Sequence, residues 1–279
     1  MLMAKHVSYL INGNSNQAIS PLDRGFAYGD GVFRTLVMRE GQPENWPLHY
    51  QKLVADCAAI KIVCPSADML INDLGQLFLP SETAVAKIIV TRGEGERGYA
   101  PPAITAPMRV VVKTTMPDYP KSYSEEGVNL HVCKTQLAAQ PLLAGVKHLN
   151  RLENVLARME WNDPTIADGI MFDTQNNVIE CTAANIFARF NDTLKTPNLN
   201  QCGIAGITRQ RIIDHAHLWH LKIKIEQINL EQLLNADEVI ISNSLFTTWQ
   251  VQQILHKNWQ PSFLANHIRK TLAYDKTRL

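Results

Sequence analysis

The chain has 279 residues, of which 46% are hydrophobic and 19% are charged, a composition typical of a folded globular protein. These values exclude a disordered chain, a collagen-like fibre and a coiled-coil rod. The 27 basic and 26 acidic residues leave a formal net charge of +1, so no strong overall field attracts nucleic acid or an anionic membrane. We therefore expect neither nucleic acid nor a membrane among the partners.

The five cysteines are odd in number and irregularly spaced, which favours a reducing compartment over a disulfide framework or a zinc ribbon. The sequence has no run of about 18 apolar residues, so it predicts no membrane-spanning helix. The first nine residues lack the apolar core of a secretion signal. Together these features predict a cytoplasmic protein.

The first part of the chain mixes strand patterns with one clear helix pattern. Leu53, Cys57 and Ile60 fall at positions i, i+4 and i+7, which predicts a helix between Leu48 and Ile62. Short, largely apolar runs predict strands at Val7–Ile11, Val32–Met38, Ala86–Thr91 and Arg109–Lys113.

The next segment, Thr114–Gly127, is polar and contains two prolines and a glycine. It is therefore the best candidate for a linker between domains. We expect a smaller N-terminal domain over residues 1–117, an interdomain linker over 118–126 and a larger C-terminal domain over 127–279. Both domains are expected to be of the α/β (α+β) class, because strand and helix patterns alternate in each.

Two helices are predicted in the second part of the chain. Leu152, Val155, Leu156 and Met159 form one helical stripe, and Ile212, Ala216 and Trp219 form another on a helix that begins near Thr208. Predicted strands are Val128–Cys133, Gly169–Phe172, Val178–Cys181, Ile186–Arg189 and Glu238–Ile241, the second and third of them joined by a polar turn at Thr174–Asn177.

Lys147 is the first candidate for catalysis, because an apolar run leads into it and a helix follows. A lysine in a desolvated pocket has its charged form disfavoured, and the free amine becomes nucleophilic, as a Schiff-base lysine requires. The alternative is a lysine that extends its ammonium into solvent at the start of a helix.

Glu180 ends an apolar run and is a candidate for a half-buried acid, which needs a partner of opposite charge. A protonated pyridine nitrogen is one such partner, and an arginine is the alternative.

A glycine-rich turn, Gly203–Gly206, opens the helix that begins near Thr208. The N–H groups of Ile207 and Thr208 at such a helix start are suited to binding phosphate, although many loops share this pattern. Ser244, just after a predicted strand, could add a hydroxyl group.

The segment Ser20–Thr35 has three glycines within seven residues and then a predicted strand. It suggests a shaped loop that brings Tyr28 and Arg34 near a ligand. The alternative is a tight turn that only needs positive φ angles.

Taken together, these segments resemble the fold-type IV family of pyridoxal-phosphate enzymes, which contains branched-chain and D-amino-acid aminotransferases and aminodeoxychorismate lyase. The resemblance extends from about Leu10 to Val251. Its most discriminating part is the run Lys-His-Leu-Asn-Arg-Leu-Glu at Lys147–Glu153. This run and the stretches at residues 23–33 and 92–99 look most like the lyase.

The resemblance implies a two-domain fold that binds pyridoxal 5'-phosphate between the domains. Lys147 would hold the cofactor covalently, and Glu180 would pair with its pyridine nitrogen. The main-chain N–H groups of Ile207 and Thr208, with Ser244, would hold its phosphate. It also implies a homodimer with active sites near the subunit contact.

One position departs from the family pattern. The family has an arginine in a His-x-x-Arg-Leu sequence that binds phosphate, whereas this chain has Lys52 in the corresponding stretch His49–Leu53. The resemblance therefore implies a phosphate contact from Lys52, made as a point charge rather than as a two-pronged fork.

The resemblance to the lyase implies conversion of 4-amino-4-deoxychorismate, a small-molecule substrate, to 4-aminobenzoate and pyruvate in folate biosynthesis. Lys147 would remove the ring proton, and the enolpyruvyl side chain would leave as the ring becomes aromatic. Arg34, Arg97 and Arg151 are candidates for the two substrate carboxylates, since arginine offers a matching planar fork. Each of the three could instead be an ordinary surface arginine.

Two other activities remain open. An aminotransferase of the branched-chain or D-amino-acid type would share Lys147 and Glu180, and a non-catalytic binder would use Lys147 structurally. The sequence also contains His215, His217 and His220, but only the last two can share a helix face and a zinc site needs more ligands. We expect no metal.

Overall fold

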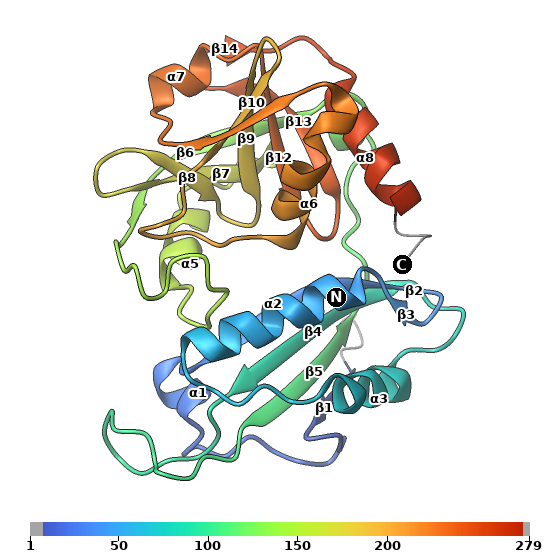
Figure 1. The fold of residues 1–279 in the computed structure, drawn as a ribbon, viewed down its shortest axis with the longest axis vertical. Coiled ribbons are helices and arrows are strands. Elements are labelled where there is room, and N and C mark those ends of the chain that lie inside the picture. The colour runs from blue at the N-terminus through green and yellow to red at the C-terminus, as the bar shows by residue number, and fades with distance from the viewer. Residues whose placement is uncertain (1–7, 276–279) are drawn as a thin grey trace. The chain divides into compact units, whose positions relative to one another are not determined.

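The structure, a computed structural model, describes residues 8–275, which form two compact units (Figure 1). The first unit extends to Pro117 and also contains Val146–Asn150, and the second contains Asp118–Gly145 and resumes at Arg151. Residues 118–126, the expected linker, belong to the second unit and contain the short helix α4 (Ser122–Glu125).

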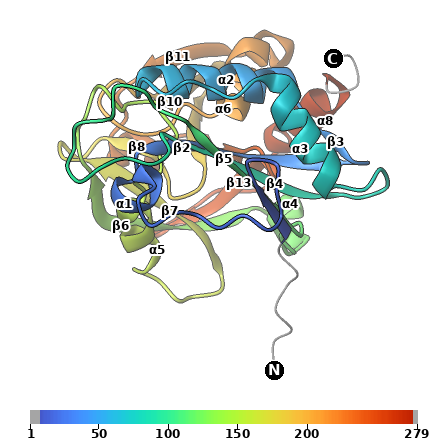
Figure 2. The same ribbon diagram turned by 90° about the horizontal axis from the view of Figure 1, so that it is seen from below.

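Within the described part of the first unit, five strands form an antiparallel sheet in the order β1-β5-β4-β2-β3. Helices α2 and α3 cover one face of this sheet (Figure 2). The elements are β1 (Ser8–Ile11), α1 (Arg24–Tyr28), β2 (Gly31–Arg39), β3 (Gln42–Pro43), α2 (Trp46–Ala59), α3 (Ala67–Leu77), β4 (Ala84–Thr91) and β5 (Met108–Thr114).

The core of the first unit follows from the two-residue period of the strands. Val32 and Leu36 of β2 point toward the helices and pack with Leu53 of α2 and Leu70 of α3. Burying each such side chain contributes about 1.5–3 kcal/mol. Arg34 lies between Val32 and Leu36 on the same face, so a charged side chain is directed toward the helix layer.

The four strands and the helix expected in this part of the chain are confirmed. The expected strand at Val7–Ile11 is β1, apart from Val7, which lies outside the described residues. The helix begins at Trp46 rather than Leu48, because Pro47 occupies its first turn, where its missing N–H costs nothing.

Within residues 118–145 and 151–275, a mixed sheet has the order β11-β10-β9-β12-β13-β6-β7-β8, with β14 paired to β13. The pairs β10–β11, β13–β6 and β6–β7 are parallel and the others are antiparallel. Its strands are β6 (Val128–Leu137), β7 (Ile166–Asp173), β8 (Val178–Cys181), β9 (Asn185–Phe190), β10 (Thr193–Pro197), β11 (Lys222–Glu226), β12 (Glu238–Asn243), β13 (Thr247–Ile254) and β14 (Lys257–Asn258).

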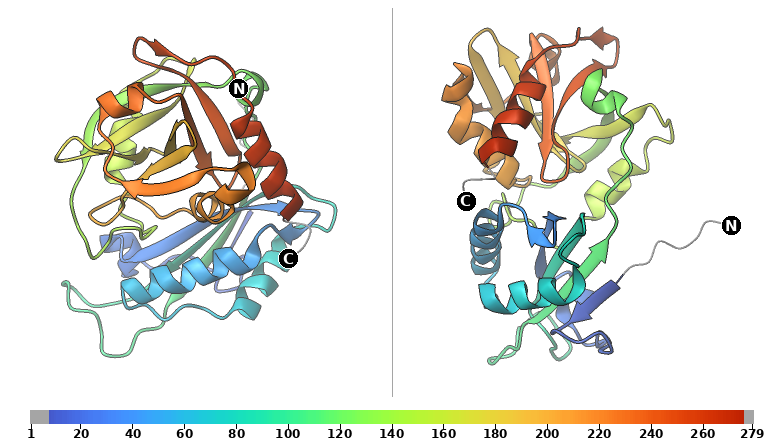
Figure 3. Two further views of the ribbon diagram at one scale, coloured as in Figure 1. Left: turned by 45° about the horizontal axis from the view of Figure 1, so that its top comes forward. Right: turned by 90° about the vertical axis from the view of Figure 1, so that its right-hand side faces the viewer.

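The helices of the second unit include α6 (Ile207–His215), which continues into a 3₁₀ turn, and α8 (Leu264–Asp275). Figure 3 shows α8, in red, along β13. The predicted stripe of Ile212, Ala216 and Trp219 is buried against the sheet. The other helices are α5 (Leu152–Arg158) and α7 (Leu230–Leu234).

The predicted helix at residue 152 is confirmed as α5, but its apolar stripe is not part of a core. Leu152 and Met159 are 69% and 70% exposed, and Val155 and Leu156 are about half exposed. Ala157 is the residue of α5 that is buried. The second unit therefore presents an apolar helix face that its own chain leaves uncovered.

Among the described residues, no helix has the length and apolar character needed to cross a membrane.

Candidate active site

Lys147 lies in the segment Val146–Asn150, which adds to the edge of strand β2. The Phe33 N–H donates to the Lys147 carbonyl at 2.9 Å, and the Leu149 N–H donates to the Gly31 carbonyl at 2.9 Å. The Lys147 ammonium then lies 4.7 Å from the centre of the Phe33 ring. The catalytic candidate is therefore attached to the sheet through its main chain.

The close approach of this segment explains a glycine in strand β2. A Cβ atom at Gly31 would lie 2.6 Å from the Val90 carbonyl oxygen and 2.8 Å from a methyl group of Leu149. Only a residue without a side chain fits between these neighbours.

The buried carboxylate of Asp56, on helix α2, receives three donors. Arg34 Nη1 donates to Asp56 Oδ2 at 3.2 Å, and the Lys147 main-chain N–H donates to the same oxygen at 3.4 Å. Lys52 Nζ, one helical turn before Asp56, forms an ion pair with Oδ1. Asp56 is 1% exposed, so this arrangement lies in a low-dielectric environment.

These contacts define where two of the predicted ligand-binding residues lie. Arg34 is 3% exposed, and its burial lowers the pKa of its guanidinium, against which the charge of Asp56 acts. Burial likewise lowers the pKa of Lys52, and Asp56 again opposes the shift. An ammonium has three N–H groups, so the pairing of Lys52 with Asp56 is compatible with a phosphate contact.

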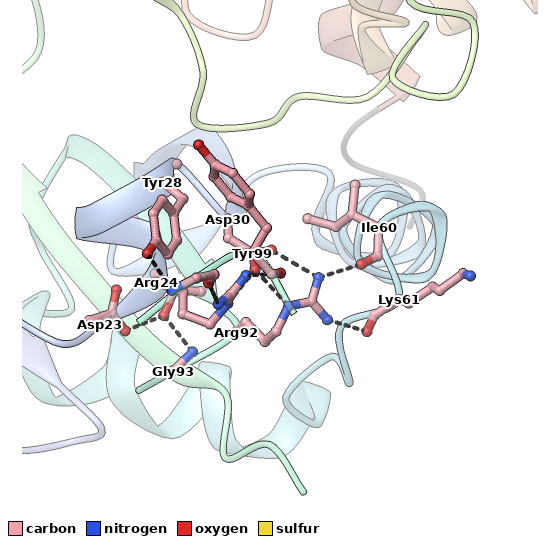
Figure 4. A network of polar contacts seen from close by, with 12 residues as sticks. Asp23, Arg24, Tyr28, Asp30, Ile60, Lys61, Arg92, Gly93 and Tyr99 are labelled. Atoms are coloured by element: carbon pink, nitrogen blue, oxygen red, sulfur yellow. Dashed lines mark hydrogen bonds and ion pairs between the residues drawn. The ribbon is translucent and has the colours of Figure 1, made fainter. Parts of the chain in front are cut away.

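The glycine-rich segment after Asp23 forms a network of ion pairs (Figure 4). Asp30 accepts from Arg24 Nε at 2.9 Å and from Arg92 Nε at 2.7 Å. Burial alone would raise the pKa of Asp30, but the hydrogen bonds and charges of Arg92 and Arg24 lower it. Gly29 ends helix α1 with φ +67°, so at this position the turn itself requires glycine.

The same network fixes the loop that contains Arg97. Arg24 donates to the carbonyl oxygens of Gly98 and Tyr99 at 3.0 and 2.9 Å. The Tyr28 hydroxyl accepts from the Gly98 N–H at 3.2 Å, and its ring lies 5.5 Å from that of Tyr99 (Figure 4). Tyr28 is therefore tied to this loop, on which Arg97 is exposed.

Glu180 is on strand β8 of the second unit and is 2% exposed. Its Oε2 atom accepts from the Ile204 N–H at 2.8 Å, which connects the carboxylate to the glycine-rich turn before α6. Gly203 has φ +86°, and a Cβ atom there would lie 2.6 Å from a methyl group of Ile179. The turn can reach Glu180 because residue 203 is glycine.

Asn185 holds the other end of this turn, a function that the sequence patterns did not assign. Its Nδ2 donates to the Ile204 carbonyl at 2.8 Å, and its Oδ1 accepts from the Gly206 N–H at 3.2 Å. A Cβ atom at Gly206 would lie 2.4 Å from Asn185 Oδ1. Asn185 follows Glu180 by five residues, across the short connection between β8 and β9, and this spacing was the available signal.

Helix α6 begins directly after this turn, with Gly206 as its N-cap. Within the described chain no side chain caps α6, so the N–H groups of its first turn, at Ile207 and Thr208, are presented as at an anion-binding helix start. Together with a buried carboxylate in the same unit, this arrangement fits a group that has both a phosphate and a basic ring nitrogen.

Ser244 lies in the turn between β12 and β13. Asn243 shapes this turn, because its Oδ1 accepts from the N–H groups of Leu245 and Phe246 at 2.9 and 3.1 Å. Ser242, at the end of β12, pairs with Asn185 of β9, the residue that is hydrogen-bonded to the glycine-rich turn.

Two arginines of the second unit interact electrostatically with Glu180. Burial lowers the pKa of Arg151, and the charges of Glu180 and Glu153 oppose that shift. Burial also lowers the pKa of Arg209, against the charge of Glu180. The charge of Glu180 therefore acts on two arginines of its own unit, in keeping with the arginine partner that the sequence offered as the alternative to a ring nitrogen.

The described residues contain no group of three or more His, Cys, Asp or Glu side chains arranged to hold a metal ion. His215 and His217 instead contact main-chain carbonyl oxygens of their own helical region, those of Arg211 and Asp214, at 2.8 and 3.0 Å.

Comparison with known proteins agrees with this fold. Residues 31–254 match the family described as amino-transferase class IV, and the chain belongs to this family. Its two mixed units are those of the fold-type IV aminotransferase architecture, as expected from the sequence.

Three relatives allow a finer comparison within the family. An aminodeoxychorismate lyase of Vibrio harveyi is 35% identical over 237 residues, which cover 85% of this chain and 88% of the relative. The crystal structure of 4-amino-4-deoxychorismate lyase from Pseudomonas aeruginosa matches with a TM-score of 0.90 and 38% identity, covering 96% of this chain and 98% of that one. A D-alanine aminotransferase of Listeria monocytogenes is 28% identical over 238 residues, 84% of this chain and 80% of the relative.

Proposed function

We propose that this protein is a pyridoxal-phosphate-dependent lyase that converts 4-amino-4-deoxychorismate to 4-aminobenzoate and pyruvate. The observation that carries the proposal is the similarity to two lyases, at 35% and 38% identity over at least 85% of the chain. The identity to the aminotransferase of Listeria monocytogenes is lower, 28%, over a similar share of the chain.

The proposed cofactor-binding residues are those whose local structure suits each part of pyridoxal phosphate. Ile207 and Thr208 would donate main-chain N–H groups to the phosphate at the start of α6, with Ser244 as a further donor. Lys52 would add a positive charge. Glu180, buried and held by the loop before α6, would keep the ring nitrogen protonated. When bound, the cofactor supplies an electron-accepting pyridinium ring.

Lys147 has two proposed tasks. Its Nζ atom would attach the cofactor, and with the amino group of the substrate in its place the freed amine would remove the proton from the ring carbon that bears that group. The main-chain contacts of Lys147 to the sheet hold the backbone that carries this amine in place during both tasks. The C–O bond between the ring and the enolpyruvyl group would then break, and the ring would become aromatic, which favours product formation. The proton taken up by Lys147 would return to the departing group to give pyruvate.

For the substrate we propose Arg97 and Arg151 as ligands of the two carboxylates, and Tyr28 as a further substrate-binding residue. Arg34 is the remaining arginine candidate, but its guanidinium pairs with the buried Asp56. An exposed or half-buried guanidinium can form the two-pronged contact that a carboxylate accepts.

We further propose a cytoplasmic homodimer. The odd number of cysteines favours a reducing compartment. The exposed apolar side chains of α5 form a surface that a second copy of the chain would cover, since contiguous apolar patches of this kind usually mark interfaces.

The test is to incubate the purified full-length protein, loaded with pyridoxal phosphate, with 4-amino-4-deoxychorismate and to measure pyruvate and 4-aminobenzoate. Equal molar amounts of the two products are expected. A parallel reaction offers branched-chain or D-amino acids with a 2-oxo acid acceptor. Transfer of the amino group there, without pyruvate in the first reaction, would instead establish the aminotransferase alternative.

A further inference from the structure

The contacts of Lys147 indicate which other residue controls its position. Its main chain is held on both sides: the carbonyl oxygen by the Phe33 N–H at 2.9 Å, and the N–H by Asp56 Oδ2 at 3.4 Å. The first contact belongs to a sheet edge. The second comes from a helix, so Asp56 is the side chain that connects Lys147 to the helix layer of its unit.

Asp56 is itself held firmly enough to transmit this restraint. Two of its neighbours on helix α2, Leu53 and Cys57, are fully buried in the core between α2 and the sheet. Arg34, directed from β2 toward the same helix, donates to the oxygen that accepts from Lys147. The carboxylate is thus fixed from the helix side and from the sheet side.

The charges around Asp56 explain why the residue is a carboxylate and not an amide. Arg34 is buried and Lys52 is half-buried, and the positive charge of Arg34 acts against that of Lys52. One carboxylate between them offsets the repulsion, and both of its oxygens are used. An amide would offer one accepting oxygen to three donors and would direct its NH₂ group at a cation.

We propose that Asp56 is a positioning residue for Lys147: it holds the main-chain N–H of the catalytic lysine, and Arg34 holds Asp56. This inference rests on the proposed function only in that Lys147 is the catalytic lysine. It assigns Arg34 to the support of Lys147. A purely structural alternative is that Asp56 neutralises buried Arg34 and has no effect on Lys147.

The test measures exchange of the Lys147 main-chain amide hydrogen in full-length protein labelled with ¹⁵N-lysine. In D56A the amide loses its acceptor, and its exchange should accelerate at least about tenfold, since the acceptor is a charged group. D56N keeps one accepting oxygen and should give an intermediate rate. In the cofactor-loaded proteins, the visible absorption band should shift in D56A, and kcat should fall more than KM rises.

Asp73 provides a matched control. It is also 1% exposed, lies on helix α3 of the same unit and pairs with Arg109, but has no contact with Lys147 among the described residues. D73A should lower the melting temperature as D56A does and leave the Lys147 amide and the absorption band unchanged. Unchanged exchange in D56A, or equal acceleration in D73A, would overturn the proposal.

A second variant covers the case in which D56A does not fold. Replacing Arg34 and Asp56 together, each by Leu, removes the two fully buried charges and leaves only the half-buried Lys52, which proteins tolerate better than the loss of one buried partner. The Lys147 amide should still exchange faster in this protein, and wild-type exchange would again refute the inference. Because the amide measurement needs no turnover, it stays informative if the wild type forms no pyruvate and the proposed reaction is thereby disproved.

Discussion

Lys147 is held through its main chain on both sides. Its carbonyl oxygen accepts from the Phe33 N–H, and its N–H donates to the Asp56 carboxylate. A second lysine, Lys87 on β4, reaches the same Phe33 ring, at 4.8 Å. Contact with that ring therefore does not identify the catalytic lysine.

We predict that Lys147→Ala abolishes the visible absorption of the cofactor-loaded protein and lowers turnover at least about 10⁴-fold, the upper range for loss of a general base. Both effects follow because one amine attaches the cofactor and moves the proton. The measurements are an absorption spectrum and pyruvate release. Lys87→Ala is the control and should keep the absorption band. A Lys147→Ala protein with its band intact would contradict the assignment.

A second prediction concerns Lys52. If its ammonium reaches the cofactor phosphate, Lys52→Ala should weaken cofactor retention by roughly one to two orders of magnitude, as expected for a lost charged hydrogen bond of ~1.5–3 kcal/mol. Retention is measured by dialysis followed by absorption spectroscopy, with the exposed Lys61→Ala as control. A lower melting temperature without faster cofactor loss would mean that Lys52 serves only Asp56.

At the scale of elements, the turn before α6 combines two restraints, Glu180 at one end and Asn185 at the other. The helix start that this turn presents is defined by contacts to strands β8 and β9, because the glycines of the turn contribute no side-chain packing of their own. Adding a side chain within the turn should therefore weaken anion binding more than it lowers global stability.

Gly206→Ala tests this expectation. The backbone at residue 206 has φ −71°, which alanine adopts freely, so the effect comes from the methyl group 2.4 Å from Asn185 Oδ1. The loop must shift, and we predict about tenfold weaker cofactor retention with little change in melting temperature. Gly75→Ala is the control, since nothing lies within 4 Å of its added Cβ and a helical alanine should stabilise by about 0.5–1 kcal/mol. Equal retention in both variants would contradict the prediction.

Glu160 links the end of α5 to strand β6 where the pairing of β6 with β7 shifts register. It accepts from the N–H groups of Lys134 and Thr135 at 2.7 and 2.8 Å. Burial alone would raise the pKa of Glu160, but these hydrogen bonds and that of the Thr135 hydroxyl lower it to about 2. The carboxylate thus replaces strand pairing at an irregular point of the sheet.

A folded-state pKa below the ordinary value of 4.5 means that ionised Glu160 stabilises the fold above that pH, and that this contribution is lost as the pH falls toward about 2. Glu160→Gln should therefore lower the free energy of unfolding at pH 7, and the difference from wild type should narrow between pH 5 and pH 3. Urea unfolding at several pH values measures it. A difference independent of pH would contradict the prediction.

At the scale of the whole molecule, the exposed stripe of α5 decides the expected behaviour in solution. Val155 and Met159 are four residues apart and share a helix face. An apolar helix face that is exposed to water favours association of two copies of the chain, because covering the face removes apolar surface from water.

We predict that the wild-type protein scatters light as a particle of twice 31.4 kDa, and that the double variant Val155→Glu with Met159→Glu dissociates at micromolar concentration. Phe263→Glu, at another exposed apolar residue, is the control and should stay dimeric. A monomeric wild type would refute the homodimer. A dimeric double variant would place the contact elsewhere.

The sequence alone determined the elements whose patterns are local. The strands β2, β4 and β5 and helix α2 follow from periods of two and about 3.6 residues, which any short window contains. The family resemblance has the same origin, because the run Lys147–Glu153 and the glycine-rich segments are continuous in the chain. That resemblance gave the fold class, and the family match confirms it.

Only the tertiary structure decided the partners of these residues. Asp56 meets Lys147 across 91 positions, and Arg34 turns toward α2 instead of lying at a surface. The exposure of the α5 stripe and the parallel pairing of β13 with β6 were equally undetermined by the sequence. The physical reason is that periodicity fixes which face of an element is apolar, whereas the surface against which that face packs depends on contacts between segments distant in the chain.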